Sequence, residues 1–340
     1  MKYKVIFTTD RGEWHQQTAL KSAPANLDIS ILRVPDKETL VNALQDAEFL
    51  ISERFGIIDN EIIHNAPKLR LIQRLGSLVH DIDLTAAAQA GVAVCYKPIS
   101  GVIRVAEHLV MQMLAVSKKL REVEAIALAA SPEWGKSHRT DEDTFAYNWS
   151  GRTGVGQIWE RTVGIIGFGE IGVEFARRMK GWGCNVLYNK RIRLPEQIEV
   201  NLGLTYVSQD ELFSRSDVLV NLLPFVPGTD MLLNAAIFEQ MKAGSYLVSC
   251  GSGSTIDEAA LADAVRTGKL AGAALDTFEF EPILTDNPLI AAAKDGFNIL
   301  LTPHTAAGTA EHDGSIPDRS GDYANINNYL AGRPLEYQIV

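Results

Sequence analysis

The feature that most constrains this chain is residues 162–172, where a short apolar run ends in the pattern Gly-x-Gly-x-x-Gly. The run has the length of a buried strand, and residues 173–180 continue with a helical pattern. In such a unit the first glycine allows a tight turn, the second lets a pyrophosphate approach the backbone, and the third lets helix and strand pack closely. The phosphates then lie at the helix N-terminus, where free N–H groups and the helix dipole favour negative charge. The segment predicts a dinucleotide site; the alternative is a glycine-rich turn in another α/β protein. Its contacts would be Gly167, Phe168, Gly169, Glu170, Ile171 and Gly172.

Length and composition limit the class of protein. A chain of 340 residues suggests about two domains. Its 32 Lys and Arg residues against 42 Asp and Glu residues give a net charge of −10, which argues against non-specific nucleic-acid binding. No stretch reaches the ~18 unbroken apolar residues of a membrane-spanning helix. The apolar run near the start is cut by polar residues at 8–10, too early for a signal peptide. We therefore expect a cytoplasmic protein with neither nucleic acid nor membrane as a partner.

The three cysteines, Cys95, Cys184 and Cys250, form neither a CxxC pair nor a Cys/His spacing typical of a metal site. The sequence therefore predicts no metal. A sparse and odd cysteine count also fits a reducing compartment.

Apolar runs and helical patterns alternate along most of the chain. Repeated β-α-β units of this kind predict parallel sheets covered by helices. Residues 131–160 are the least regular part, and their tryptophans suggest packing against a surface such as a partner subunit. The strands are expected at 4–8, 29–34, 49–51, 69–75, 92–95, 162–166, 185–188, 217–223, 245–250, 271–275 and 299–301. The helices are expected at 37–46, 60–65, 84–90, 103–120, 173–180, 257–267 and 323–330.

Several sequence blocks occur in one order along the chain: GSLVHDID (76–83), VAE (105–107), VGIIGFGEIG (163–172), LPFVPGT (223–229), TIDEAAL (255–261), LDTFEFEP (275–282) and TPHTAA (302–307). With these blocks the chain resembles the D-isomer-specific 2-hydroxyacid dehydrogenases nearly end to end. The resemblance implies an α/β fold with two Rossmann-like domains: a flavodoxin-like substrate domain and an inserted, doubly wound NAD(P)-binding domain, with the active site in the cleft between them. The substrate domain would be residues 1–100 plus 305–340. The dinucleotide-binding domain would be 101–304, with a dimerisation helix and loop that imply a homodimer.

The resemblance also implies a catalytic pair. His304 matches the family histidine that gives or takes the hydroxyl proton, a task that suits an imidazole. Glu281 matches the carboxylate that holds that imidazole. Asp276 matches a partner of the nicotinamide carboxamide, although a capping or turn role is the alternative. The loop whose N–H groups would hold the substrate carboxylate is Gly76, Ser77, Leu78 and Val79.

The chain departs from the family pattern at three places. Ser252 stands where the family has an arginine that clamps the substrate, and a hydroxyl cannot replace a bidentate guanidinium. Leu78 stands where a glycine is expected, so the carboxylate loop could be reshaped. Arg104 stands where a small hydroxyl residue is usual. We hypothesise that Arg104 partly replaces the lost arginine; the alternative is a surface arginine unrelated to that loss.

The end of the cofactor that carries the ribose also departs from the usual NAD pattern. The position of the expected carboxylate is Asn189, followed by Lys190, Arg191 and Arg193. Three cations and no anion favour a 2′-phosphate, and so NADP rather than NAD; an exposed basic turn is the alternative. The remaining cofactor contacts that the resemblance implies are Leu223, Pro224, Thr229, Cys250, Gly251, Asp276 and His304.

The function predicted is hydride transfer between a nicotinamide and a 2-keto/2-hydroxy acid or related carbonyl compound, with His304 as general acid/base. The partner would be this small-molecule carboxylate or carbonyl substrate. One alternative is a lyase or isomerase that uses a bound nicotinamide transiently. The other is a dinucleotide-sensing binding protein, against which the pair of His304 and Glu281 argues, since a sensor needs neither.

Overall fold

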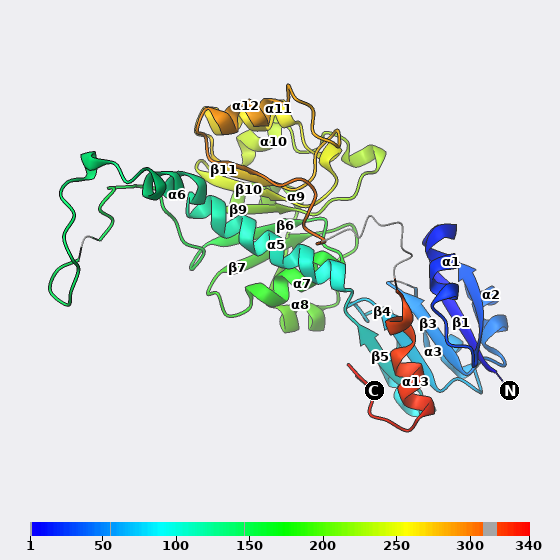
Figure 1. Ribbon diagram of the computed structural model, residues 1–340. Helices are drawn as coiled ribbons and strands as arrows, with labels where there is room; N and C mark the ends of the chain where they lie inside the picture. The colour runs from blue at the N-terminus through cyan, green and yellow to red at the C-terminus, as the bar shows by residue number, and fades with distance from the viewer. Residues whose placement is uncertain (1, 55, 146, 309–317) are drawn as a thin grey trace. The chain divides into compact units, whose positions relative to one another are not determined.

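A computed structural model describes residues 2–54, 56–145, 147–308 and 318–340. The chain forms two compact units (Figure 1): unit 1 is Met1–Ile103 with Thr309–Val340, and unit 2 is Arg104–Gly308. The domains expected from the sequence divide at 100/101 and 304/305. The first division of the structure falls inside helix α5 (Ser100–Ser117). Part of the expected C-terminal segment, 309–317, lies outside the described residues.

Unit 1 is built on a five-stranded parallel sheet with strand order β2-β1-β3-β4-β5. Helix α1 was not expected, because only Thr18 and Ala19 of its nine residues are buried and its sequence carries little apolar periodicity. The strands are β1 (Tyr3–Thr9), β2 (Leu27–Arg33), β3 (Phe49–Glu53), β4 (Leu71–Leu75) and β5 (Ala93–Lys97). The helices before α5 are α1 (Glu13–Lys21), α2 (Lys37–Leu44), α3 (Asn60–His64) and α4 (Leu84–Ala90).

The C-terminal segment completes the core of unit 1. It contains η4 (Ser320–Tyr323) and α13 (Ala324–Leu330). Tyr323 and Ile326 are fully buried among residues of β1, β3 and β4, and the Tyr323 hydroxyl donates to Ala19 O at 2.6 Å. The chain then pairs with β5 through a bridge between Cys95 and Gln338.

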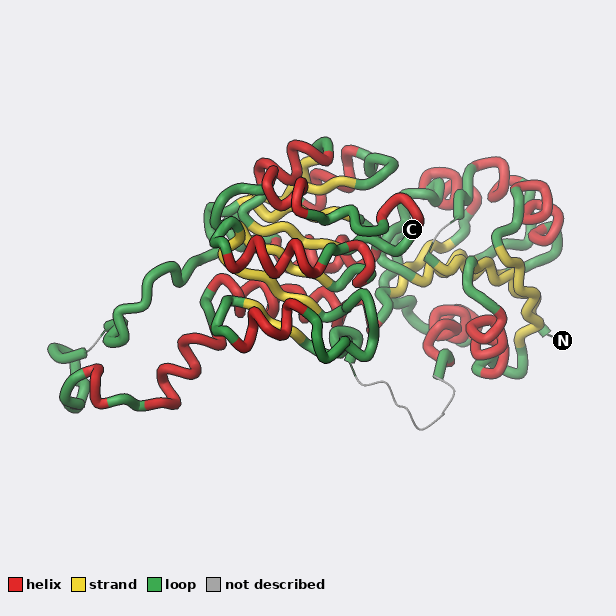
Figure 2. The backbone as a smooth tube through the Cα atoms, turned by 90° about the horizontal axis from the view of Figure 1, so that it is seen from above, coloured by secondary structure: helices red, strands yellow, loops and turns green. Residues whose placement is uncertain are grey.

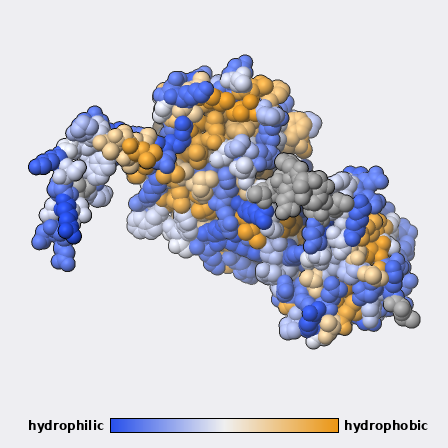
Figure 3. All heavy atoms as spheres, viewed as in Figure 1, coloured by the Kyte–Doolittle hydropathy of each residue, from blue (hydrophilic) through white to orange (hydrophobic). Residues whose placement is uncertain are grey.

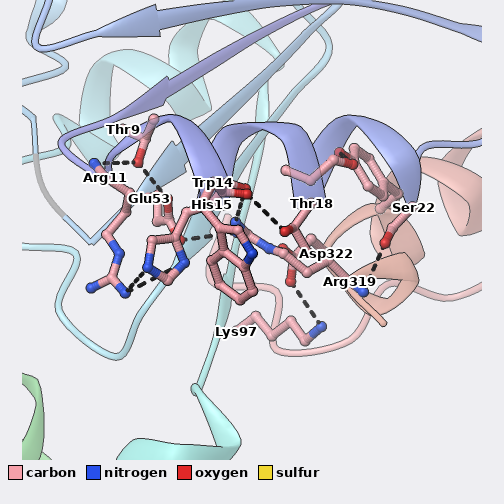
Figure 4. A network of polar contacts seen from close by, with 12 residues as sticks. Thr9, Arg11, Trp14, His15, Thr18, Ser22, Glu53, Lys97, Arg319 and Asp322 are labelled. Carbon is pink, nitrogen blue, oxygen red and sulfur yellow. Dashed lines mark hydrogen bonds and ion pairs between the residues drawn. The ribbon is translucent and has the colours of Figure 1, made fainter. Parts of the chain in front are cut away.

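Polar contacts fix the start of this segment to the sheet (Figure 4). The Arg319 guanidinium donates to Glu53 Oε1 at 2.9 Å and to Asp322 Oδ2 at 2.7 Å. Glu53 in turn accepts from the Thr9 hydroxyl at 2.5 Å, so the network joins β1, β3 and the C-terminal segment. All three members of the Arg319 group are largely buried, with side chains 15%, 9% and 14% exposed.

Unit 2 has a seven-stranded parallel sheet with strand order β12-β11-β10-β9-β6-β7-β8. Helices cover both faces of this sheet, and the same is true of unit 1 (Figure 2). The strands are β6 (Thr162–Ile166), β7 (Asn185–Asn189), β8 (Leu204–Tyr206), β9 (Val218–Asn221), β10 (Ser245–Ser249), β11 (Leu270–Leu275) and β12 (Ile299–Leu301). The helices are α7 (Glu170–Met179), α8 (Glu196–Leu202), α9 (Gln209–Arg215), α10 (Ala235–Gln240), α11 (Glu258–Arg266) and α12 (Pro288–Lys294).

A protruding segment follows the first helices of unit 2. The expected helix 103–120 corresponds to α5, which ends at Ser117. Lys119 then adopts a left-handed conformation (φ 50°), and a second helix that was not expected, α6 (Leu120–Ala129), follows. Residues 131–145 and 147–156, called the arm here, then extend away from the body of unit 2 (Figures 1 and 2). Apart from the short η1 (Pro132–Trp134), the described part of the arm has no helix or strand, as the sequence indicates. Within the described residues, no helix combines the length and apolar character needed to cross a membrane.

Candidate active site

The glycine-rich loop lies between β6 and α7, at the point where the strand order of unit 2 reverses. Gly167 has φ 83°, and a Cβ there would lie 2.6 Å from Leu222 C and Leu223 N. A Cβ on Gly172 would lie 2.9 Å from the Phe168 ring, whereas one on Gly169 would meet nothing within 4 Å. Gly169 is the N-cap of α7 and makes no side-chain cap. The first and third glycines are thus required by packing, and the second leaves open space at a helix N-terminus that suits a phosphate.

A buried asparagine joins the loops on the other side of this reversal. Asn221 ends β9 and is fully buried. Its side-chain amide donates to Ser249 Oγ at 3.1 Å and to Thr255 Oγ1 at 2.9 Å, and its Oδ1 accepts from Leu223 N at 3.1 Å. Asn221 and Thr255 therefore shape the turns after β9 and β10. We did not identify either residue from the sequence, although a polar residue at the end of an apolar strand is a usable signal.

The two residues of the predicted catalytic pair lie together. His304 Nδ1 lies 2.6 Å from Glu281 Oε2, and Glu281 Oε1 accepts from Phe278 N at 3.0 Å. His304 has φ 52°, and its N–H donates to Asp276 O at 2.8 Å. Its side chain is 59% exposed, so one face of the imidazole is open to a ligand. The pair also forms one wall of a cavity of about 660 Å³ whose other lining is mostly apolar, with Phe278, Pro282, Ile283, Ile290, Leu301, Thr302 and Pro303.

Asp276 is fully buried beneath His304. Its Oδ1 accepts from the Thr302 hydroxyl at 2.6 Å and from Thr305 N at 3.0 Å, and its Oδ2 accepts from Ala306 N at 2.8 Å. These bonds fix the loop that carries His304. These contacts fit the alternative role of Asp276, which is to fix a turn. Both of its carboxylate oxygens already accept hydrogen bonds from within the protein.

A group of polar residues that we did not identify from the sequence surrounds Asp276. His108 Nε2, on α5, lies 3.0 Å from Thr302 Oγ1 and 3.5 Å from Asp276 Oδ1. The Cys250 thiol donates to Gln112 Oε1 at 3.6 Å. Burial lowers the pKa of His108; burial and the nearby Asp276 carboxylate raise the pKa of the Cys250 thiol. Both groups are thus neutral near pH 7, and Cys250 belongs to this buried group rather than to an open surface.

Ser252 begins the short 3₁₀ turn Gly253–Thr255 after β10. Its N–H donates to Leu223 O at 2.8 Å, and its hydroxyl lies 3.3 Å from Ser254 Oγ. A Cβ on Gly253 would lie 1.9 Å from Phe278 C, and one on Gly251 would lie 2.8 Å from Leu223 O. The backbone is therefore packed so that glycine is required on both sides of Ser252.

Arg104 lies near the loop of His304 and has no described contact with Ser252. It is exposed, and its Nη1 donates to Ala307 O at 3.3 Å. A Cβ on Gly308 would lie 2.9 Å from Arg104 Cδ and Nη1. The guanidinium therefore packs on the segment just past His304.

At the predicted ribose end, the three cations have different surroundings. Asn189 ends β7, and its side-chain amide donates to Val207 O at 2.8 Å. Arg191 is exposed and Lys190 is half-buried. Arg193 donates to both oxygens of the buried Glu199, at 2.9 Å and 2.7 Å, and this hydrogen-bonded pairing lowers the pKa of Glu199. Arg193 thus already pairs with Glu199, and its predicted contact with a 2′-phosphate would compete with that pairing.

Two other predicted contacts have clear local roles. The Thr229 hydroxyl donates to Pro224 O at 2.8 Å and accepts from Val226 N at 2.9 Å, which closes the turn after β9. Leu223 is half-buried and Pro224 is exposed at that turn.

In unit 1, the predicted carboxylate loop follows β4. Gly76 has φ 141°, and its N–H donates to Lys97 O at 2.8 Å. Ser77 and Leu78 are buried, and Val79 is half-buried. A fully buried arginine that we did not identify from the sequence, Arg74, donates to Leu78 O at 3.2 Å and to Gly56 O at 3.2 Å. It also lies 2.8 Å from Asp81 Oδ1, so one cation holds the loops after β3 and β4.

Comparisons with known proteins agree with this arrangement. Residues 110–306 match the family described as "D-isomer specific 2-hydroxyacid dehydrogenase, NAD binding domain". The chain belongs to this family. A glyoxylate reductase of Thermococcus onnurineus is 32% identical over 274 residues, which are 80% of this chain and 77% of that protein. A D-3-phosphoglycerate dehydrogenase of Mycobacterium leprae is 33% identical over 287 residues, 84% of this chain. The chain of 340 residues spans about half of that relative's length, 49%. Among solved structures, a protein of Pyrococcus horikoshii OT3 is 27% identical with a TM-score of 0.57, covering 100% of this chain and 95% of the other.

Proposed function

We propose that the protein transfers a hydride between a nicotinamide dinucleotide and a 2-keto/2-hydroxy acid. The observation that carries this proposal is the pairing of His304 with Glu281 at 2.6 Å, on the carboxyl edge of the same sheet that carries the glycine-rich loop. Ligands of open parallel sheets bind at this edge. The named relatives, a phosphoglycerate dehydrogenase and a glyoxylate reductase, support the same reaction class.

In this mechanism, His304 is the proton donor and acceptor. Glu281 occupies Nδ1, so Nε2 is the atom that exchanges a proton with the substrate oxygen. In the reductive direction the carbonyl oxygen takes the proton from Nε2 while the carbonyl carbon receives the hydride. The nicotinamide supplies that hydride when it is bound. Glu281 stabilises the imidazolium form that donates.

The residues fit a dinucleotide at the β6–α7 loop. The space beside Gly169 and the uncapped start of α7 suit a pyrophosphate. The test is Gly169→Ala: its φ of −124° is accessible to alanine, so the variant should fold with an unchanged melting temperature. Binding of NADPH or NADH, measured by fluorescence titration, should weaken at least tenfold, because the methyl group occupies the phosphate space. Gly12→Ala, at an equally open position in unit 1, is the matched control and should bind normally. Unchanged binding in Gly169→Ala would remove the dinucleotide from this loop.

For the 2′ position we propose a preference for NADP over NAD. Asn189 brings no negative charge to the end of β7, and Lys190 and Arg191 follow it directly. Arg193 is left out of this proposal because Glu199 holds it. Asn189→Asp should reverse the preference by repelling the 2′-phosphate. Calorimetric titration of the unaltered protein that finds NADH bound as tightly as NADPH would overturn it.

The replacement of the family arginine by Ser252 keeps a second reaction class open. An enzyme without the clamp could use the nicotinamide transiently, for elimination or isomerisation. The two classes separate by stoichiometry: the proposed dehydrogenase consumes one reduced nicotinamide per 2-keto acid reduced, starting with glyoxylate as probe. Substrate turnover with no net change in nicotinamide absorbance would replace the proposal with the transient-redox reaction. Retained binding without any turnover across a 2-keto acid panel would favour the sensor.

We also propose a homodimer formed through α6 and the arm. None of the residues of α6 is buried, although its sequence is largely apolar, and apolar side chains gather there in Figure 3. Leu128 is 79% exposed and Tyr147 in the arm is 86% exposed. Apolar surface of this kind in a soluble protein marks an interaction site. Leu128→Asp should halve the mass measured by light scattering, and Val200→Asp, at a residue on α8 that is 67% exposed, should leave it unchanged. A monomeric unaltered protein would contradict this.

A further inference from the structure

The fold brings three different metal-ligating side chains together beneath the loop of His304. His108 comes from α5, Cys250 follows β10 and Asp276 follows β11. One ligand atom from each, the imidazole nitrogen, the thiol sulfur and a carboxylate oxygen, lie within 4.8 Å of one another. His108 Nε2 and Asp276 Oδ1 are already 3.5 Å apart, about the separation of two ligands on one tetrahedral ion with bonds near 2.1 Å. The three residues are distant in the sequence. A search for short metal-binding motifs therefore could not find this cluster.

The chemistry of the three groups matches one class of ion. Imidazole, thiolate and carboxylate are the ligands that Zn²⁺ takes in proteins, usually four at a time. Two further oxygens adjoin the cluster: Thr302 Oγ1 lies 3.0 Å from His108 Nε2, and Gln112 Oε1 lies 3.6 Å from Cys250 Sγ. Either of these groups, or a water, can complete a tetrahedron. The His108 side chain is 12% exposed, so the cluster lies just beneath the surface.

We propose that His108, Cys250 and Asp276 form a binding site for a thiophilic divalent cation, with Zn²⁺ as the natural representative of the class. The metal binds in place of the hydrogen bonds that these side chains now make with Thr302 and Gln112. The thiol loses its proton as it becomes a ligand.

Occupation of this site has a consequence for His304, and this consequence rests on the proposed function. Asp276 now fixes the backbone of Thr305 and Ala306. Its Oδ1 also accepts from Thr302. Moving that oxygen onto a metal removes bonds that hold the loop on both sides of His304. Zn²⁺ therefore inhibits the enzyme by displacing the imidazole, without competing for the substrate.

The binding itself is tested with Co²⁺ alone, using untagged protein freed of metal by a chelator. We expect one Co²⁺ per chain, with the visible bands of a tetrahedral ion and a near-ultraviolet thiolate-to-cobalt band. Cys250→Ser should abolish the thiolate band and weaken binding at least tenfold. Cys184→Ser, which changes the other half-buried thiol of unit 2, should keep both. If Cys250→Ser does not fold, as judged by circular dichroism, His108→Gln serves instead and should weaken binding similarly. Absence of Co²⁺ binding, or a thiolate band that disappears with Cys184 or Cys95, overturns the site.

The inhibition is tested separately by the ratio of rates with and without Zn²⁺, and by recovery on adding chelator. We expect Zn²⁺ to lower the rate at least tenfold in the unaltered protein and by a smaller factor in Cys250→Ser. Equal inhibition by Zn²⁺ in both proteins overturns the inhibitory role. The cobalt spectrum still tests, by itself, whether the metal site exists. If no 2-keto acid is turned over at all, the proposed function fails, and the cobalt result stands independently of it.

Discussion

Glu281 Oε2 lies 2.6 Å from His304 Nδ1, and the two residues are carried by loops that follow the neighbouring strands β11 and β12. We predict that His304→Asn lowers turnover about a hundredfold or more, the usual scale for loss of a general acid/base. Glu281→Gln should cost less, because the imidazole remains but loses its anionic partner. Steady-state rates with the best 2-keto acid measure both effects, and melting temperatures verify folding. Turnover near the unaltered rate in His304→Asn would remove His304 from the mechanism.

The contact of Arg104 with Ala307 bears on the missing family arginine. Since Arg104 and Ser252 have no described contact, we expect Arg104→Ser and Ser252→Arg to act independently. Their effects on kcat/KM should add within about 0.5 kcal/mol in a double-mutant cycle. A larger coupling energy would instead support the hypothesis that Arg104 replaces the clamp.

The pair of Arg193 and Glu199 predicts a pH-dependent contribution to stability. Hydrogen bonding to Arg193 holds the pKa of Glu199 below its ordinary value of 4.5. The contribution is therefore complete above that ordinary value and is lost as the pH falls through the lowered pKa. Glu199→Gln should lower the urea midpoint at pH 7, with a smaller difference in acid. Urea denaturation at several pH values measures this, and a penalty that does not shrink in acid would contradict the pairing.

The packing of Gly253 predicts a large effect from one methyl group. A Cβ there would lie 1.9 Å from Phe278 C and 2.0 Å from Phe278 O, so the backbone must move. We expect Gly253→Ala to lose about 3 kcal/mol or more of stability, or to be insoluble. Gly228→Ala, where a Cβ meets nothing within 4 Å, is the matched control and should stay within about 1 kcal/mol. Equal stabilities of the two variants would be incompatible with the described backbone.

Arg319 predicts a local effect confined to unit 1. Arg319→Met leaves the largely buried Glu53 without its cation and leaves Asp322 with only Lys97, at 3.4 Å. Breaking such a pair costs about 3 kcal/mol. Hydrogen exchange should rise in β1, β3 and α13 and stay unchanged in β6 and β7. A uniform rise across both units would show that the residue acts on the whole chain rather than on unit 1.

The parts of the fold that follow from short-range patterns could be predicted from the sequence. Strand β12 and helix α4 have the bounds expected, because an apolar run or a Gly91 terminus marks each. Helices α8, α9, α10 and α12 were not predicted, since each has six or seven residues and offers too little periodicity.

The predicted site shows the same limit. His304 and Glu281 could be paired because both lie in recognisable blocks. The roles of Asn221, Arg74 and His108 depend on what the fold places beside them, and a single sequence does not give that information. Arg193 was counted as an available cation because Glu199, six residues away, becomes its partner only once the turn after β7 has formed.

Unit 1 is built from the two ends of the chain, and this determines which unit is completed first during synthesis. All residues of unit 2 have been synthesised once Gly308 has been added. Unit 1 still lacks Tyr323 and Ile326 from its core at that moment, and the outer side of β5 lacks the pairing with Gln338. Domains fold as units while the chain emerges from the ribosome. Until the C-terminal segment is made, one apolar face of the unit 1 sheet is therefore covered only in part, by α1, while unit 2, which begins later in the chain, is already complete. During that interval unit 1 is the part of the nascent chain that a chaperone would hold.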